Sequence, residues 1–146
     1  MKKKIKKILL VGLGAEIGSM LLSINNPKKD GLSIDTVITR QIFSKDNHTQ
    51  LESLYARLVL NEPSLLPYLE IDEKNQIIKI KDRKIKVFWG DITKFNIKNI
   101  KKRFDATIIA TSKTHINNKN LMKKFLQISE FVFGVAESKY FPAIYP

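Results

Sequence analysis

Three glycines that follow a short apolar run have the clearest potential for ligand binding in this 146-residue chain. Gly12, Gly14 and Gly18 come directly after the run Ile8–Val11 and lead into a helical pattern. In a strand-turn-helix unit, such glycines let the backbone approach a pyrophosphate, and the helix N-terminus attracts its negative charge. The pattern predicts a dinucleotide site, although its spacing is G-x-G-x-x-x-G and the usual fingerprint is G-x-G-x-x-G.

Other reactive side chains give weaker signals. The chain has no cysteine, which excludes disulfides, thiolate metal sites and a cysteine nucleophile within these residues. Its two histidines, His48 and His115, have no companion at metal-ligand spacing, and we expect a helix cap and a loop residue, respectively. Asp91 is expected in a turn, with contact to an adenine as the alternative. The sequence therefore predicts no catalytic and no metal-binding residue.

The elements that must position the glycine turn follow an α/β alternation. Short apolar or β-branched runs alternate with segments of helical spacing, which is typical of a mainly parallel sheet with helices on both faces. We therefore predict a Rossmann-like fold in a single domain, 1–146. The predicted strands are Ile8–Val11, Ile34–Thr39, Asp105–Ala110 and Phe131–Val135, and the predicted helices are Ala15–Ile24, Leu51–Leu60 and Asn118–Ile128.

The middle of the chain interrupts this alternation with period-two patterning. Three segments, Leu69–Asp72, Gln76–Lys81 and Lys84–Phe88, alternate apolar and polar residues and are separated by two short turn sequences. Alternation of this kind is typical of antiparallel strands that expose one face. An antiparallel hairpin inserted into the parallel sheet is therefore predicted.

Charge and hydropathy restrict the choice of partners. The formal net charge is +12, but all except four of the 26 basic residues are lysines without interleaved aromatics, so we expect a solvated surface and no nucleic-acid partner. The lysine-rich start imitates a signal peptide, but Glu16 and the glycines interrupt its apolar region. No apolar stretch approaches the roughly 18 residues that span a bilayer. These observations predict a soluble, cytoplasmic protein without a membrane partner.

The order of these elements resembles the N-terminal domain of the glyceraldehyde-3-phosphate dehydrogenase family. The resemblance rests on the glycine turn, on the hairpin sequence Ile71–Phe88 and on Ile108–Ser112, which stands where that family has a strand ending in Ser-Thr-Gly. It implies an NAD(P)-binding domain of an oxidoreductase that oxidises an aldehyde by hydride transfer. It also implies that the catalytic domain is absent, because the chain ends near where that domain begins. A separate catalytic domain or a homo-oligomer would then be the partner.

The same resemblance implies a set of cofactor-binding residues. NAD or NADP is the implied cofactor. At the end of the second predicted strand, Arg40 stands where an acidic residue normally binds the ribose, which favours a 2′-phosphate and therefore NADP over NAD. The implied residues are Gly12, Gly14, Glu16, Ile17, Gly18, Arg40, Gln41, Ala110, Thr111 and Ser112.

Two alternatives remain open from the sequence. The first is a stand-alone Rossmann module that senses or binds a nucleotide and presents a basic surface. The second is a fragment like the short-chain dehydrogenases and epimerases, but no tyrosine of this chain has a lysine four residues later, as that group's proton-transfer pair requires.

Overall fold

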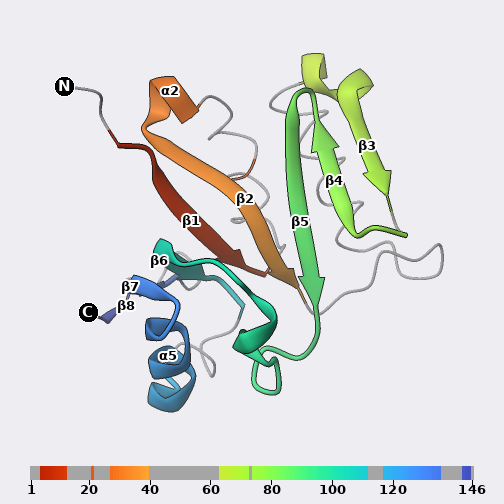
Figure 1. Ribbon diagram of the computed structural model, residues 1–146. Coiled ribbons are helices and arrows are strands. Elements are labelled where there is room, and N and C mark those ends of the chain that lie inside the picture. Colours follow the sequence, from red (N-terminus) through yellow and green to blue (C-terminus); the bar gives the residue numbers. More distant parts are fainter. Residues whose placement is uncertain are drawn as a thin grey trace.

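The computed structural model describes residues 4–12, 21, 27–39, 63–72, 74–111, 117–135 and 143–145 (Figure 1). Their strands form a mixed sheet in the order β3-β4-β5-β2-β1-β6-β7-β8. The predicted α/β fold with a mainly parallel sheet is confirmed. The strands are β1 (Lys6–Val11), β2 (Leu32–Thr39), β3 (Leu69–Asp72), β4 (Ile77–Ile80), β5 (Arg83–Trp89), β6 (Phe104–Ile109), β7 (Ser129–Gly134) and β8 (Ala143–Tyr145), and the helices are α2 (Pro27–Asp30), η1 (Pro63–Tyr68), η2 (Ile97–Asn99) and α5 (Lys119–Leu126).

The parallel part of the sheet consists of five adjacent strands with β1 at its centre. β1 pairs in parallel with β2 on one side and with β6 on the other, and β5 and β7 extend the parallel pairing outward. All four residues of Ile8–Val11 are buried because both faces of this strand are covered. A continuous apolar run is the pattern that such a doubly covered strand requires.

The predicted hairpin is confirmed as an antiparallel β3-β4-β5 meander at one end of the sheet. Its second turn differs by one residue from the prediction, which placed it at Asp82–Arg83. Arg83 already pairs with Ile80, and the turn lies at Lys81 and Asp82, where Lys81 adopts a left-handed backbone with φ of 53°. The difference arises because a lysine rarely adopts that conformation and gives no turn signal in the sequence.

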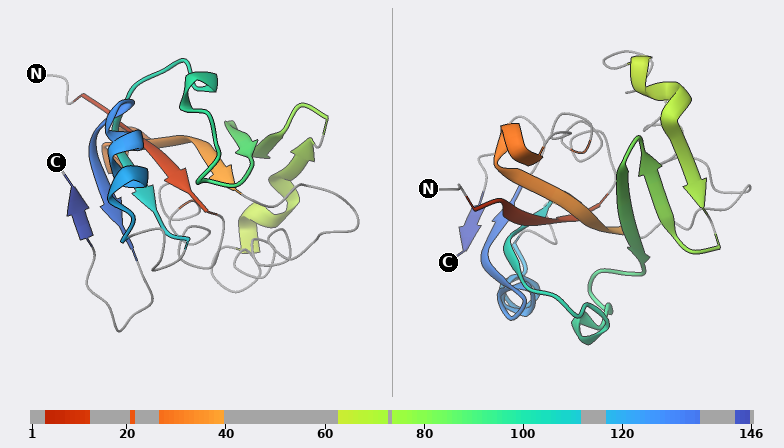
Figure 2. Two further views of the ribbon diagram at one scale, coloured as in Figure 1. Left: turned by 90° about the horizontal axis from the view of Figure 1, so that it is seen from below. Right: turned by 45° about the horizontal axis from the view of Figure 1, so that its top comes forward.

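Each face of the sheet carries its own apolar cluster. Side chains alternate along the strands, so Leu10 packs with Leu21 and with Leu65 of η1, whereas Leu9 packs with Phe125 of α5 and Ile97 of η2. Figure 2 shows η1 on one side of the sheet and η2 and α5 on the other. Of the predicted helix Ala15–Ile24, the structure describes only Leu21, which is helical and fully buried.

Several element boundaries differ from the prediction. The sequence pattern did not reveal α2, which begins at Pro27 because the first turn of a helix tolerates proline. β7 begins at Ser129, two residues before the predicted start at Phe131, because Ser129 pairs with Phe104. β8, which the sequence pattern did not reveal, pairs antiparallel with β7. The predicted helix Leu51–Leu60 lies outside the described residues.

No helix among the described residues is long and apolar enough to cross a lipid bilayer.

Candidate functional site

The connectivity of the sheet creates a switch point beside β1. From β1 the chain proceeds to β2 on one side, continues through the hairpin to β5, and then crosses to β6 on the other side of β1. In open sheets of parallel strands, ligands bind at the carboxyl ends of the strands where the strand order reverses in this way. The carboxyl ends of β1 and β6 are therefore the candidate site.

Gly12 occupies the end of β1 under two constraints that only glycine satisfies. Its φ is +106°, a backbone conformation that side chains of L-residues rarely adopt. A Cβ atom built on Gly12 would lie 2.7 Å from the carbonyl oxygen of Ala110, closer than real Cβ contacts. The backbones of the two strands thus approach each other at the point where they leave the sheet.

The sheet's hydrogen bonds continue to this edge and align the strand ends in one row. The amide of Gly12 donates to the carbonyl oxygen of Ile38 at 2.6 Å, and the amide of Ala110 donates to that of Val11 at 3.0 Å. At the end of β7, the amide of Val135 donates to the carbonyl oxygen of Ile109 at 2.8 Å. These backbone bonds therefore hold the strand ends side by side at this edge.

Of the predicted site residues, the structure brings Gly12, Ala110 and Thr111 together at this edge. A Cβ on Gly12 would also lie 3.4 Å from the Thr111 methyl carbon. The remaining predicted cofactor-binding residues lie outside the described part of the chain: Gly14, Glu16, Ile17, Gly18, Arg40, Gln41 and Ser112. The two histidines, His48 and His115, lie outside it as well.

The sequence reasoning did not include Thr39, Gly90 and Val135, which complete the row. Thr39 ends β2, is 3% exposed, and accepts through its carbonyl oxygen the amide of Gly90 at 3.0 Å. Gly90 follows β5 with a φ of 153°, just as Gly12 follows β1. A glycine directly after an apolar run was therefore the signal that could have identified this second strand end.

The described row has a chemical character suited to binding. Glycine, alanine, valine and threonine provide backbone groups and hydroxyls, and none of these side chains ionises near neutral pH. Asp91, beside the row, accepts the amide of Thr93 at 2.9 Å and its hydroxyl at 2.6 Å, which confirms the predicted turn role. Among the described residues, no three histidine, aspartate or glutamate side chains gather as a metal site requires.

Arg83 connects the hairpin to the elements behind the site. One guanidinium nitrogen donates to the carbonyl oxygen of Leu21 at 2.8 Å, and the other donates to that of Ile34 in β2 at 3.4 Å. Burial lowers the pKa of Arg83, and the carboxylate of Asp30 partly opposes this shift. The guanidinium group remains charged and donates to both carbonyl oxygens, so Arg83 connects β5 with β2 and with Leu21.

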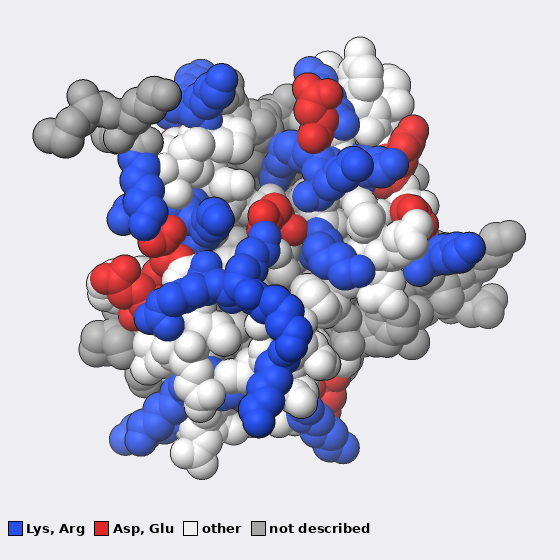
Figure 3. Space-filling view, in the orientation of Figure 1, with Lys and Arg blue, Asp and Glu red and all other residues white. Residues whose placement is uncertain are grey.

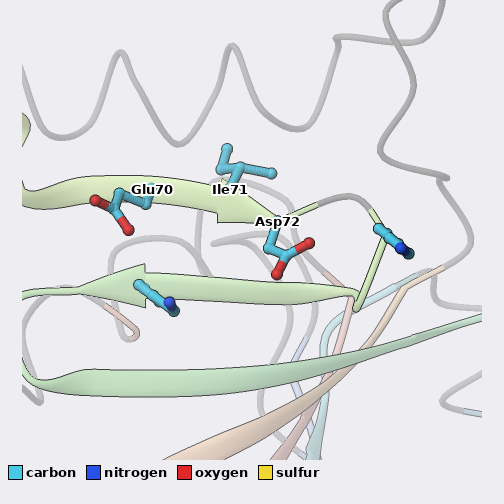
Figure 4. Close-up of a pocket in the computed structure, with 5 residues that line it drawn as sticks. Glu70, Ile71 and Asp72 are labelled. Carbon is cyan, nitrogen blue, oxygen red and sulfur yellow. The ribbon is translucent and has the colours of Figure 1, made fainter.

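A concave region lies on the hairpin, away from the switch point in the strand order (Figure 4). It is lined by Glu70, Ile71, Asp72, Lys74 and Lys79. Figure 4 shows Glu70 and Asp72 pointing to one side of β3 and Ile71 to the other. Asp72 accepts the side-chain amide of Asn75 at 2.8 Å and its backbone amide at 3.0 Å, which lowers the pKa of its carboxyl group. These bonds explain the acidic side chain as part of a turn.

Comparisons with known proteins give little support for any family. No protein-family model matches the chain, and no curated protein matches it. Among solved structures, it is similar to a "putative methyltransferase" from Thermoplasma acidophilum, with a TM-score of 0.45 and 18% sequence identity. That alignment covers 90% of this chain and 44% of the other, so this chain spans less than half the length of that protein.

The predicted membership of the glyceraldehyde-3-phosphate dehydrogenase family is wrong. No family model supports it, and the similar solved structure belongs to a protein of another description. The predicted function as the NAD(P)-binding domain of such an oxidoreductase is wrong for the same reason, whereas NAD or NADP as a ligand of the chain stays a prediction. A glycine turn followed by an inserted hairpin describes a sheet topology, and one topology can serve many unrelated activities.

Proposed function

We propose that the edge formed by the carboxyl ends of β1, β2 and β6 binds a nucleotide, and that this chain is a binding module. The observation that carries the proposal is the close approach at Gly12, where a Cβ would meet the carbonyl oxygen of Ala110 at 2.7 Å. In strand-turn-helix units that bind nucleotides, a glycine at the switch point is the residue beside which the ligand's phosphates lie. The glycines that follow in the sequence, Gly14 and Gly18, supply a second reason.

NAD and NADP are the ligands that we propose first. A dinucleotide is long enough to reach across β2, β1 and β6, and its pyrophosphate suits a glycine turn that opens a helix. The proposal assigns no catalytic residue to the described edge. Any reacting group would come from outside these described residues. We place this activity in the cytoplasm, where a chain without cysteine needs no oxidising environment.

Calorimetric titration of the purified chain with a ligand panel tests the proposal. NAD, NADP, ADP, adenosine and S-adenosylmethionine separate the contributions of the adenosine and the phosphates. We expect binding of NAD or NADP, weaker binding of ADP, and a large loss for adenosine, because the proposed site recognises the phosphates. The same panel is titrated into the test variant Gly12→Ala and into its matched control Gly31→Ala. Gly31 also has a positive φ, but it lies in the turn before β2, where a Cβ would have no atom within 4 Å. A failure of all five ligands to bind would refute the proposal.

A further inference from the structure

The part of the chain that the structure describes is strongly basic. The described residues contain 19 of the 26 basic side chains but only 8 of the 14 acidic ones, so they carry +11 of the net +12. Figure 3 shows basic side chains gathered over β4 and β5 and along the face beside them. On the face that Figure 3 shows, several of the lysines that the sequence suggests are scattered lie close to one another.

Three lysines form an array on the exposed face of the hairpin. Lys84 and Lys86 alternate with the buried residues Ile85 and Val87 along β5, so both lysines point away from that apolar cluster. Lys79 of β4 stands directly opposite Lys84 in the register. Residues two apart on a strand are separated by roughly 6.6 Å, and directly opposite residues by about 5 Å.

The charges of this array are only partly compensated. Like charges directly opposite each other in a sheet are destabilising, so the pair Lys79 and Lys84 costs stability unless an anion lies nearby. Glu70 is opposite Lys79 on its other side and offsets that residue. Lys86 donates to the neutral carbonyl oxygen of Asn75 at 3.0 Å. No carboxylate of the described residues forms an ion pair with Lys84 or Lys86.

One further lysine, Lys102, lies near this array. Lys102 lies 2.6 Å from Asp35, the residue before Thr36, and Thr36 pairs with Lys86. Asp35 neutralises this lysine, so among the described residues of this region the lysines without an ion-pair partner remain centred on β5. We name the group Lys79, Lys84 and Lys86 the lysine array.

We propose that the lysine array binds the phosphate backbone of a nucleic acid without sequence preference. A row of point charges on a sheet fits a linear polyanion, whose phosphates supply the missing countercharge. A lipid surface fits less well, because peripheral docking also requires exposed apolar side chains. The large hydrophobic residues that are exposed, Ile5, Tyr68 and Phe131, belong to none of the array's strands. This surface is separate from the proposed nucleotide edge.

Fluorescence anisotropy with a fluorescein-labelled 20-nucleotide oligothymidine tests the proposal. The whole chain is titrated at several potassium chloride concentrations, and the same is done with a labelled 20-base-pair duplex. The test variant is Lys84→Gln with Lys86→Gln. The control is Lys119→Gln with Lys123→Gln, which removes the same charge from two exposed positions of α5. All four side chains are exposed, so urea unfolding should show that both variants fold, with the test variant at least as stable as the control because it removes the like-charge pair Lys79 and Lys84.

We expect the test variant to bind the single strand about tenfold more weakly, with a shallower salt dependence. Each lost phosphate contact lowers the slope of log K against log salt by about 0.7 for single strands and about 0.9 for duplexes, so two contacts remove about 1.4 or 1.8. The control variant should lose less than about threefold, consistent with general charge alone. Comparing the two nucleic acids identifies which form the array prefers.

Three results would overturn the proposal. The first is no binding of either nucleic acid by the unmodified chain at low salt. The second is an equal loss of affinity in the test and control variants, which would assign binding to total charge. The third is binding only to vesicles of phosphatidylcholine and phosphatidylserine. Added NAD or NADP should leave nucleic-acid binding unchanged, so failure of this proposal is distinguishable from failure of the nucleotide site.

Discussion

Replacing Gly12 by alanine tests whether the close approach of β1 and β6 is as tight as the structure indicates. An alanine at φ +106° bears a backbone strain of about 1–2 kcal/mol. The contact of 2.7 Å with the Ala110 carbonyl oxygen adds an overpacking cost of about 1–3 kcal/mol. Alanine also makes the unfolded chain less flexible than glycine does, which offsets about 0.4–1 kcal/mol of this loss. The net loss of unfolding free energy is therefore about 3 kcal/mol, which lowers Tm by about 10 °C in a domain of this size.

The matched control for Gly12→Ala is Gly31→Ala, because it shares the strain but not the contact. Gly31 has a φ of +73°, and a Cβ there would meet no atom within 4 Å. Its expected cost is about 1 kcal/mol, so the two variants should differ by about 2 kcal/mol, which isolates the contact. Urea unfolding followed by circular dichroism measures both values. Equal midpoints for the two variants would refute the reasoning about the close approach.

Three further predictions concern the interior and the hairpin. Arg83→Met should cost about 1–2 kcal/mol in urea unfolding, since it removes the donor to the Leu21 and Ile34 carbonyls; an unchanged midpoint would show that these bonds add nothing. Ser129→Ala should lower the free energy of unfolding by about 1–2 kcal/mol, because the buried hydroxyl of Thr107 loses its acceptor at 3.0 Å. Adding Thr107→Val should recover part of that loss, and a further loss would contradict this account. Asp72→Asn should weaken the acid sensitivity of stability: the folded pKa of Asp72 is lowered, so its contribution is present above the unfolded pKa and is lost as pH falls through the folded one. Urea midpoints between pH 5 and pH 2 measure this effect, and parallel curves for wild type and variant would be evidence against it.

The sequence predicts the parallel strands and the hairpin well because burial imposes a strong pattern on them. Ile8–Val11 must be apolar throughout, since β1 is covered on both faces, and the hairpin must alternate, since one face is exposed. The short elements α2 and β8 were missed because three or four residues carry no measurable periodicity. The hydrogen bonds of Arg83 were also missed, because the two carbonyl groups that accept them belong to residues 62 and 49 positions away in the sequence.

The candidate site was predictable only where a backbone constraint leaves a mark on the sequence. Gly12 and Gly90 are such marks, because both follow a strand with a positive φ. Ala110 and Thr111 follow an apolar strand whose position next to β1 is typical of the fold, so their place at this edge was predictable, and their contact with a cofactor stays a prediction. The family was not predictable, since topology alone produced the resemblance that the comparisons contradict.

Nuclear magnetic resonance of the ¹⁵N-labelled chain during titration with NADP, and separately with NAD, tests the central claim most directly. Amide signals report each strand end separately, so they locate a ligand as well as detect it. We predict that the shifted amides cluster at the ends of β1, β2 and β6, with Gly12, Ala110 and Thr111 among the largest changes. Saturating nucleotide that leaves these amides unchanged, or that shifts only the lysine array on β4 and β5, would contradict the claim.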